Sequence, residues 1–192
     1  VEGNGLGGVR VRGNGEFGCC LEVRIRDSLI AANKGDGLAF EEWSGAEFTH
    51  CTIANNHDIG VRIANDVQSV VLESSIVSGN GDDVFPPGRA HAAYSNVGDG
   101  DVIAGPGVLA VDPEFVDAAG GDYRLRFGSP CVDTGAPGST GVDILGRARP
   151  IDGALDTVPR GDMGAYELAP LGGPSEVPVC LLYTSPSPRD RV

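Results

Sequence analysis

Three asparagines recur at nearly equal spacing, and this repeat restricts the fold more than any other feature of the chain. Asn33, Asn56 and Asn80 follow one another in steps of 23 and 24 residues. A fixed period in this range is typical of solenoids, in which each repeat is one turn of the chain and packs only on its neighbours.

Within a repeat, apolar and polar residues alternate, as in residues 23–26 (VRIR). This period of two indicates short strands with one buried face. Aligning the repeats places Ile25, Phe48 and Leu72 in one column. A single coil cannot bury such residues, but stacked coils pair each strand with its equivalent about 4.8 Å away. The sequence therefore predicts an all-β fold, a parallel β-helix with coils of about 23–24 residues and the apolar columns inside.

The asparagines suit the internal turn because Asn tolerates left-handed backbone and its amide can bond to the chain at a bend. We expect Asn33, Asn56 and Asn80 to stack as a structural ladder along the axis. Cys51 falls in a small inward column with Ser28 and Ser75, so we favour a buried small residue there over a reactive thiol.

The chain divides into three parts by composition. Residues 1–111 carry the coils, with an insertion expected at about residues 12–20. Residues 112–167 are rich in Asp, Gly and Pro and are expected to form an irregular C-terminal cap. Residues 168–192 read as a disordered linker and a non-native tail. Because the chain enters the repeat mid-pattern, we expect a fragment from which earlier coils and a signal peptide are missing.

The C-terminal part carries a series of motifs: DPEFVD at 112–117, GDYRL at 121–125, GSPCVDTG at 128–135 and DMGAYE at 162–167. Together with the repeats, these motifs resemble bacterial surface proteins of the right-handed parallel β-helix type, often described as choice-of-anchor Q or pectate-lyase-like β-helix proteins. The resemblance covers about residues 4–167. It implies a right-handed β-helix located extracellularly or at the cell surface, and it implies no particular reaction.

The net charge of the chain restricts the classes of molecule that it can bind. The chain of 192 residues has a net charge of −13 and a pI near 4.4. No nucleic acid is expected as a partner, because its phosphates need Lys and Arg opposite them. No run of 18 apolar residues occurs, so we expect no membrane span in this fragment.

Acidic residues follow each ladder asparagine, and they are the candidate metal ligands: Asp36, Asp58, Asp82 and Asp83. On successive coils such carboxylates would lie near one another and would repel unless they were protonated, turned apart into water or bridged by a cation. Calcium, with its preference for several oxygen ligands, is the cofactor that would suit them. The alternative, which we favour, is that Asp simply prefers turns.

Asp82 and Asp83 are also the candidate catalytic acids. The sequence Gly81-Asp82-Asp83 resembles the paired aspartates of β-helix pectin hydrolases, in which one carboxylate protonates the leaving oxygen and another activates water. The partner motifs of those enzymes are missing, so the turn interpretation is favoured.

Arg62 is the candidate base for polysaccharide-lyase chemistry. It belongs to a set of arginines expected to point outward, where they could face a glycan: Arg10, Arg24, Arg26 and Arg62. We favour ordinary surface charge for all of them.

Other polar and aromatic residues give no catalytic pattern. His50, His57 and His91 lack nucleophile partners and metal-ligand spacing, and each is expected to be a solvated polar residue. Trp43 is expected either to stack on a sugar or to pack over the coil edge.

Two function classes remain open. The first is a secreted or cell-surface β-helix that is non-catalytic and serves adhesion, glycan binding or structure. The second is a carbohydrate-active enzyme, a polysaccharide lyase or a glycoside hydrolase, with its site on the outer face of the coils. In both classes the partner is a polysaccharide or a cell-surface glycan, and the fold alone does not separate them.

Overall fold

The computed structural model describes residues 2–3, 7–12, 21–41, 44–64, 69–99 and 105–169. Trp43, residues 13–20 of the expected insertion and the tail from residue 170 onward lie outside the described residues. Within those ranges, no helix has both the length and the apolar character that a membrane span requires.

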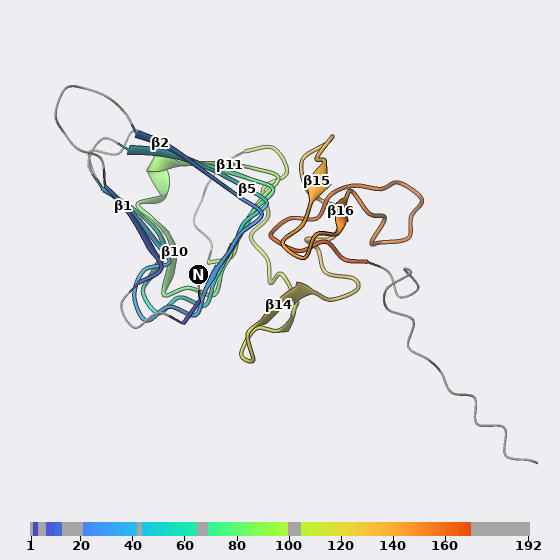
Figure 1. Cartoon of the computed structure of the whole chain (residues 1–192), viewed down its shortest axis with the longest axis horizontal. Helices are drawn as coiled ribbons and strands as arrows, with labels where there is room; N and C mark the ends of the chain where they lie inside the picture. The colour runs from blue at the N-terminus through green and yellow to red at the C-terminus, as the bar shows by residue number, and fades with distance from the viewer. Residues whose placement is uncertain are drawn as a thin grey trace, which may run out of the picture.

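Strands β1 to β12 form three parallel sheets, and each strand pairs with its equivalent one coil away. The β1 sheet contains β1 (Val9–Arg12), β4 (Leu38–Glu41), β7 (Ile59–Ile63) and β10 (Asp82–Phe85). The β2 sheet contains β2 (Leu21–Arg26), β5 (Ser44–Thr49), β8 (Val70–Glu73) and β11 (Ala90–Ala93). The β3 sheet contains β3 (Leu29–Ala31), β6 (Thr52–Ala54), β9 (Ile76–Ser78) and β12 (Asn96–Val97). Seen along the coil, the three sheets are the sides of a triangle, with the short turn η1 (Pro87–Arg89) at one corner (Figure 1).

The predicted apolar column lies inside this triangle. Ile25 is in register with Phe48, and Phe48 with Leu72. Phe48 and Leu72 are fully buried, and Ile25 packs against the same core. The ring of Phe40, from the β1 sheet, meets Phe48 edge-on with ring centroids 5.7 Å apart. Burying one such side chain stabilises the folded state by about 1.5–3 kcal/mol relative to leaving it in water. The prediction of a parallel β-helix is therefore confirmed.

The three asparagines are joined along the axis. Nδ2 of Asn33 donates to Oδ1 of Asn56 at 2.8 Å, and Nδ2 of Asn56 donates to Oδ1 of Asn80 at 2.8 Å. A Cβ atom on Gly37 would lie 2.6 Å from Nδ2 of Asn56, and one on Gly60 would lie 2.6 Å from Nδ2 of Asn80. The ladder therefore requires glycine at these two positions, because the asparagine amide groups occupy the space that a Cβ atom would fill.

A second internal column sits at the turn between the β2 and β3 sheets. The backbone N–H of Cys51 donates to the hydroxyl of Ser75, and the N–H of Ser75 donates to the hydroxyl of Ser95. Cys51 is fully buried, and burial raises the pKa of its thiol to about 12. Its role is that of a small packed residue, because a thiol that stays protonated is a poor nucleophile.

Residues 112–168 form what we call the side layer. It contains two small antiparallel pairs, β13 (Phe115–Asp117) with β14 (Asp122–Leu125) and β15 (Gly141–Val142) with β16 (Ala148–Arg149). The sequence suggested a cap, but this segment lies along the side of the coil, against the β3 sheet, and not over its end (Figure 1).

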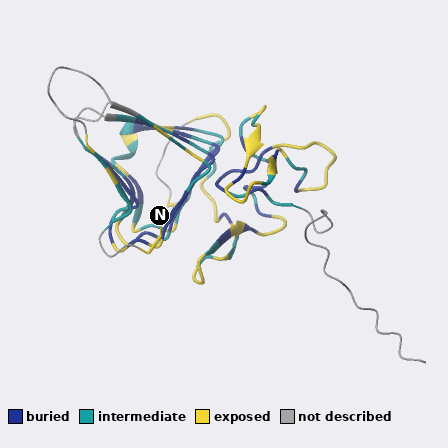
Figure 2. Ribbon diagram, viewed as in Figure 1, coloured by how far each residue is buried: buried dark blue, intermediate teal, exposed yellow. Residues whose placement is uncertain are grey.

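The side layer makes the β3 sheet buried on both faces. Leu29, Ala31 and Ala54 point outward from the coil and pack with Tyr123, while Ile76 packs with Leu125 and Met163. Figure 2 shows buried residues where the side layer meets the coil and mostly exposed loops on its far side. Strands β3, β6 and β9 of this sheet consist of apolar residues and the small polar residues Thr52 and Ser78 for this reason, since both faces need cover.

Buried carboxylates hold the irregular side layer together. Asp133 accepts the N–H groups of Gly153 and Ala154. Three more acids accept backbone N–H groups in the same way: Asp143 from Leu145, Arg147 and Glu167; Asp162 from Asp133 and Leu168; Glu167 from Ile151 and Asp162. Arg149 is the cation among them and donates to Oε2 of Glu167 at 2.7 Å. These Asp and Glu residues thus bond to backbone N–H groups that the two short strand pairs of the side layer leave without a partner.

Candidate functional site

The outer face of the β2 sheet carries polar side chains in two neighbouring rows, of which the first runs from Arg24 through Glu47 to the apolar Val71. Glu47 lies between two arginines, 3.2 Å from Nε of Arg24 and 3.5 Å from Nη2 of Arg26. Arg26 itself is in register with Thr49, and Thr49 with Glu73. The row Arg26, Thr49, Glu73 ends where the strands end, so its side chains stand at the edge of the sheet.

The chain turns sharply just after this row. Asp27, His50 and Ser74 occupy equivalent positions with positive φ values of 45°, 51° and 48°. Asp and His visit this left-handed region more readily than most residues. The turn directs these three side chains away from the coil and toward the side layer.

A tight turn of the side layer forms the opposite wall. Residues 136–139 (Ala-Pro-Gly-Ser) have proline second and Gly138 third with φ +81°, the sequence and geometry of a type II turn. The hydroxyl of Ser139 donates to the carbonyl of Ala136 at 2.7 Å, and the N–H of Ala136 donates to the hydroxyl of Ser74 at 2.9 Å. These bonds fix the turn against the coil.

Between the two walls lies a cavity of about 280 Å³, which we call the polar cleft. Its polar lining comes from both parts of the chain: Arg26, Asp27, Thr49, Glu73, Ser139 and Thr140. The cleft therefore presents carboxylates as acceptors, a guanidinium as donor, and hydroxyls that can serve as either.

His50 lines the same cleft, and the expectation that it is solvated was wrong. It is only 6 % exposed, because the side layer covers it. Its Nδ1 lies 3.2 Å from the carbonyl oxygen of Asp162, so Nδ1 carries the proton and donates. Burial and the charge of Arg149 lower the pKa of His50 to about 4, which keeps the ring neutral near pH 7.

Asp27 also lines the cleft, and its pKa departs from the ordinary value. Burial raises the pKa of its carboxyl group, although Arg149 and Arg26 act against the increase. Oδ1 of Asp27 lies 3.5 Å from Nε of Arg149. Neither of these two atoms, nor Oγ1 of Thr49, makes a hydrogen bond to the described part of the chain. The first two atoms compensate each other as an ion pair. A buried hydroxyl without a partner, such as that of Thr49, costs about 1–3 kcal/mol.

The acidic residues that the sequence singled out lie elsewhere, at or just before the first residues of strands in the β1 sheet. Asp36 pairs with Arg62 at 2.6 and 2.8 Å and accepts the N–H of Ile59. Burial favours a higher pKa for Asp36, but these bonds outweigh it and lower the pKa. The bond with Asp36, with further attraction from Asp58 and Asp82, raises the pKa of Arg62. A guanidinium thus sits among three of the four candidate calcium ligands.

No group of three or more His, Cys, Asp or Glu side chains suited to a metal ion occurs in the described ranges. Asp58 is exposed and bonds to His57 at 2.8 Å, and Asp36 and Asp58 line a separate open cavity of about 510 Å³ together with Arg10. Calcium binding at these residues therefore stays a prediction, and the site would have to displace Arg62 from Asp36.

Asp82 and Asp83 are not equivalent. Asp82 is partly exposed, whereas Asp83 is fully buried and uses both of its oxygens. Oδ1 accepts from Nδ2 and N of Asn80, and Oδ2 accepts the N–H groups of Gly98 and Asp99. A carboxylate held in this way is out of reach of a substrate.

Sequence reasoning missed the polar cleft. Arg26 was noted as an outward residue, but Asp27, Thr49 and Glu73 were not singled out. The only local signal was the polar column Asp27, His50, Ser74 directly after the strands. Ser139 and Thr140 follow them by more than sixty positions in the sequence, and nothing in the repeat shows that they return to it.

The comparisons with known proteins support the fold. A family model described as "Right handed beta helix region" matches residues 1–98. Searches among curated proteins and among solved structures found no match.

Proposed function

We propose that this chain, which belongs to the right-handed β-helix family, is a non-catalytic glycan-binding protein that holds one sugar unit in the polar cleft. The observation that carries the proposal is the mixed lining of Asp27, Glu73, Arg26 and hydroxyl groups within one small cavity. A sugar ring presents adjacent hydroxyls that donate and accept at once, and such a lining matches them.

The size of the cleft supports a single sugar unit. Sites for drug-sized ligands are cavities of about 300–1,000 Å³. At about 280 Å³ the polar cleft is at the low end, so one ring of a longer glycan would enter and the rest would extend over the coil. The outward rows of the β2 sheet continue from the cleft and would meet the neighbouring units.

The charges favour a neutral sugar over an acidic one. Asp27 and Glu73 both line the cleft, and Arg26 is already engaged by Glu47. A carboxylate on the ligand would meet two carboxylates there, whereas neutral hydroxyls would donate to them.

The cleft is held in place before any ligand arrives. The turn at residues 136–139 closes on itself through Ser139 and is tied to the coil through Ser74. Groups fixed in advance lose less entropy on binding.

A secreted or cell-surface location, in a bacterium, is part of this proposal. It is supported by the resemblance of the C-terminal motifs to surface proteins of that type. Adhesion to a glycan-coated surface is the role that a rigid coil with one sugar subsite would serve.

Hydrolysis of a glycan is the second candidate, and one observation favours it. Asp27 and Glu73 line the same cleft, and two carboxyl groups at one site are the pairing that glycosidases use. Burial raises the pKa of Asp27, which is the direction that a general acid requires. Release of reducing ends from the bound glycan would identify this activity.

The test begins with a glycan array, followed by calorimetric titration of the glycans that bind. Glu73→Gln and Thr49→Val should each weaken binding about tenfold, the loss of one hydrogen bond to a ligand. Asp58→Asn, an exposed acid on another face, is the matched control and should leave affinity unchanged. Binding that survives Glu73→Gln unaltered, or that Asp58→Asn weakens equally, would exclude the polar cleft.

A further inference from the structure

A second and larger cavity, of about 580 Å³, opens on the side layer. We call it the apolar groove, because most of its lining residues are apolar: Val116, Leu125, Phe127, Leu155, Leu168 and Ala169. It shares no lining residue with the polar cleft. Sites for small molecules are cavities of about 300–1,000 Å³, so the size of the groove suits one small molecule.

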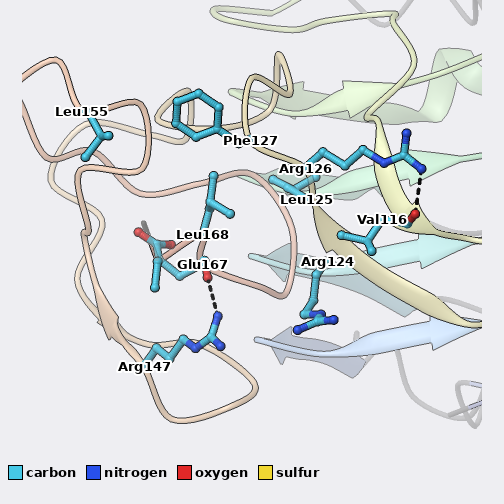
Figure 3. Close-up of a pocket in the computed structure, with 10 residues that line it drawn as sticks. Val116, Arg124, Leu125, Arg126, Phe127, Arg147, Leu155, Glu167 and Leu168 are labelled. Atoms are coloured by element: carbon cyan, nitrogen blue, oxygen red, sulfur yellow. Dashed lines mark hydrogen bonds between the residues drawn. The ribbon is translucent and has the colours of Figure 1, made fainter. Parts of the chain in front are cut away.

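Two large apolar side chains of the groove are open to solvent. Phe127 is 68 % exposed, more than any other large apolar side chain in the described ranges, and Leu155 is 60 % exposed. In the view of Figure 3, Leu168 lies between these two residues and the guanidinium groups of Arg147 and Arg124. Covering Phe127 and Leu155 would remove apolar surface from water, which stabilises a complex with a hydrophobic ligand.

The carboxyl groups in and beside the groove are already bonded within the protein. Glu167 lines the groove and is buried. Its Oε2 accepts from Nη1 of Arg149 at 2.7 Å, and its Oε1 accepts the N–H of Ile151 at 2.8 Å. Asp122 accepts two bonds from the lining residue Arg124, at 2.8 and 2.6 Å. These carboxylates therefore do not need a cationic group from a ligand.

The other two arginines of the wall also have partners within the chain. Nη2 of Arg126 donates to the carbonyl of Val116 at 2.7 Å, and Nη1 of Arg147 donates to the carbonyl of Glu167 at 3.2 Å (Figure 3). These bonds orient the guanidinium groups, and the hydrocarbon stems of the arginines add apolar surface to the wall.

The wall thus contains charges of both signs, and its charged groups bond inside the protein. A charged group on a ligand would lose part of its hydration in the groove without a partner reserved for it, which costs free energy. The main gain that a ligand can make is cover for the exposed apolar surface.

We propose that the apolar groove binds a neutral, predominantly apolar small molecule, whose hydrocarbon body covers Phe127, Leu155 and Leu168. This ligand differs from the sugar proposed for the polar cleft, because it depends on hydrophobic contact and not on hydrogen bonds. Either proposal can fail without the other.

The experiment is calorimetric titration of the full chain with 1-octanol. Octanoate and octylammonium carry a similar chain with a negative or a positive charge, and neither should bind more tightly than octanol. Hexanol should bind about fifteenfold more weakly than octanol, because each CH₂ group removed from water contributes about fourfold in affinity.

Phe127→Ser and Leu155→Ser should each reduce octanol affinity about tenfold. Both residues are exposed, so their replacement should leave the unfolding midpoint unchanged. Phe85→Ser is the matched control, because Phe85 is a 50 % exposed phenylalanine on β10, outside the groove. This variant should bind octanol as the wild type does.

The proposal is overturned if octanol does not bind, if hexanol binds as tightly as octanol, or if Phe85→Ser weakens binding as much as Phe127→Ser. Tenfold tighter binding of octanoate or octylammonium would also overturn it, because the ligand would then be recognised by its charge. Sedimentation of the chain with and without octanol tests for a protein occupant. A dimer that octanol dissociates would show that a second copy covers the groove, and this too would overturn the proposal.

Discussion

Nδ2 of Asn80 donates a 2.9 Å hydrogen bond to Oδ1 of Asp83, so the asparagine ladder ends on a carboxylate. Asp83 follows Gly37 and Gly60 along the β1 sheet, and its side chain reaches the place that the amide of a further coil would take. An amide in the ladder must accept on one side and donate on the other, whereas the last member needs only to accept. The carboxylate meets that need.

Asp83→Asn should therefore destabilise the coil. The new amide would turn its NH₂ group either toward Nδ2 of Asn80 or toward the N–H groups of Gly98 and Asp99, and in both cases donors face donors. The expected loss is about 1–3 kcal/mol in the free energy of unfolding, measured by urea denaturation. Asp82→Asn, at the partly exposed neighbouring position, should change it by less than about 0.5 kcal/mol. Equal losses in the two variants would show that Asp83 does not terminate the ladder.

His50 should make stability depend on pH. Its pKa is about 4 in the folded protein, below the ordinary value of 6.5. Between these two pH values, the imidazole is protonated in the unfolded chain and neutral in the folded chain. Stability is therefore unaffected by His50 above pH 6.5 and falls as the pH drops from 6.5 to about 4, by about 3 kcal/mol at most.

The measurement compares the wild type with His50→Gln across this range. Burial and Glu167 raise the pKa of Asp162 to about 8, which acts in the opposite direction. Gln is chosen at position 50 because its side-chain N–H can keep the hydrogen bond to the carbonyl of Asp162, so that the surroundings of Asp162 change little between the two proteins. The stability advantage of the wild type over His50→Gln should shrink with acidification. A constant difference from pH 7 to pH 4 would mean that His50 is not held neutral.

Arg149 should be required for docking of the side layer. Arg149→Ala leaves Glu167 buried without its cation and removes the bonds to the carbonyls of Asp162 and Gly164. Breaking a buried pair in this way costs about 3–5 kcal/mol. Limited proteolysis should then cut within residues 112–168 before it cuts the coil. The double variant Arg149→Met with Glu167→Gln should recover part of the loss, because the buried Glu167 position then no longer carries an uncompensated charge. No recovery would point to packing, not charge, as the role of Arg149.

Gly164 should tolerate no side chain. It has φ +88°, its N–H donates to the carbonyl of Ser74, and a Cβ atom would lie 2.7 Å from Oγ1 of Thr52 and 2.9 Å from Cδ1 of Ile76. Gly164→Ala therefore combines backbone strain with a clash, and we expect a loss of at least about 2 kcal/mol in thermal or urea unfolding. Gly128→Ala is the matched control: Gly128 has φ +89° with open space around it, so only the strain of about 1–2 kcal/mol applies. Similar losses would argue against close contact between Gly164 and the β3 sheet.

The coil was predictable because its contacts repeat at a fixed interval. The spacing of the asparagines gave the register, and the register placed Ile25, Phe48 and Leu72 together. The candidate site was not predictable in the same way. Asp36 and Arg62 were each identified from the sequence, but their pairing, which places a guanidinium among the candidate calcium ligands, depends on side-chain geometry between coils.

The sequence alone determined the architecture of the coil, because a period of two within a period of 23 or 24 can bury its apolar residues only by stacking parallel strands. The tertiary structure alone decided where residues 112–168 pack. That segment has no repeat, and its position follows from buried acids that bond to backbone N–H groups and from apolar residues that cover Leu29, Ala54 and Ile76. The polar cleft and the buried state of His50 exist only because this long-range packing occurs, and no local pattern in the chain encodes it.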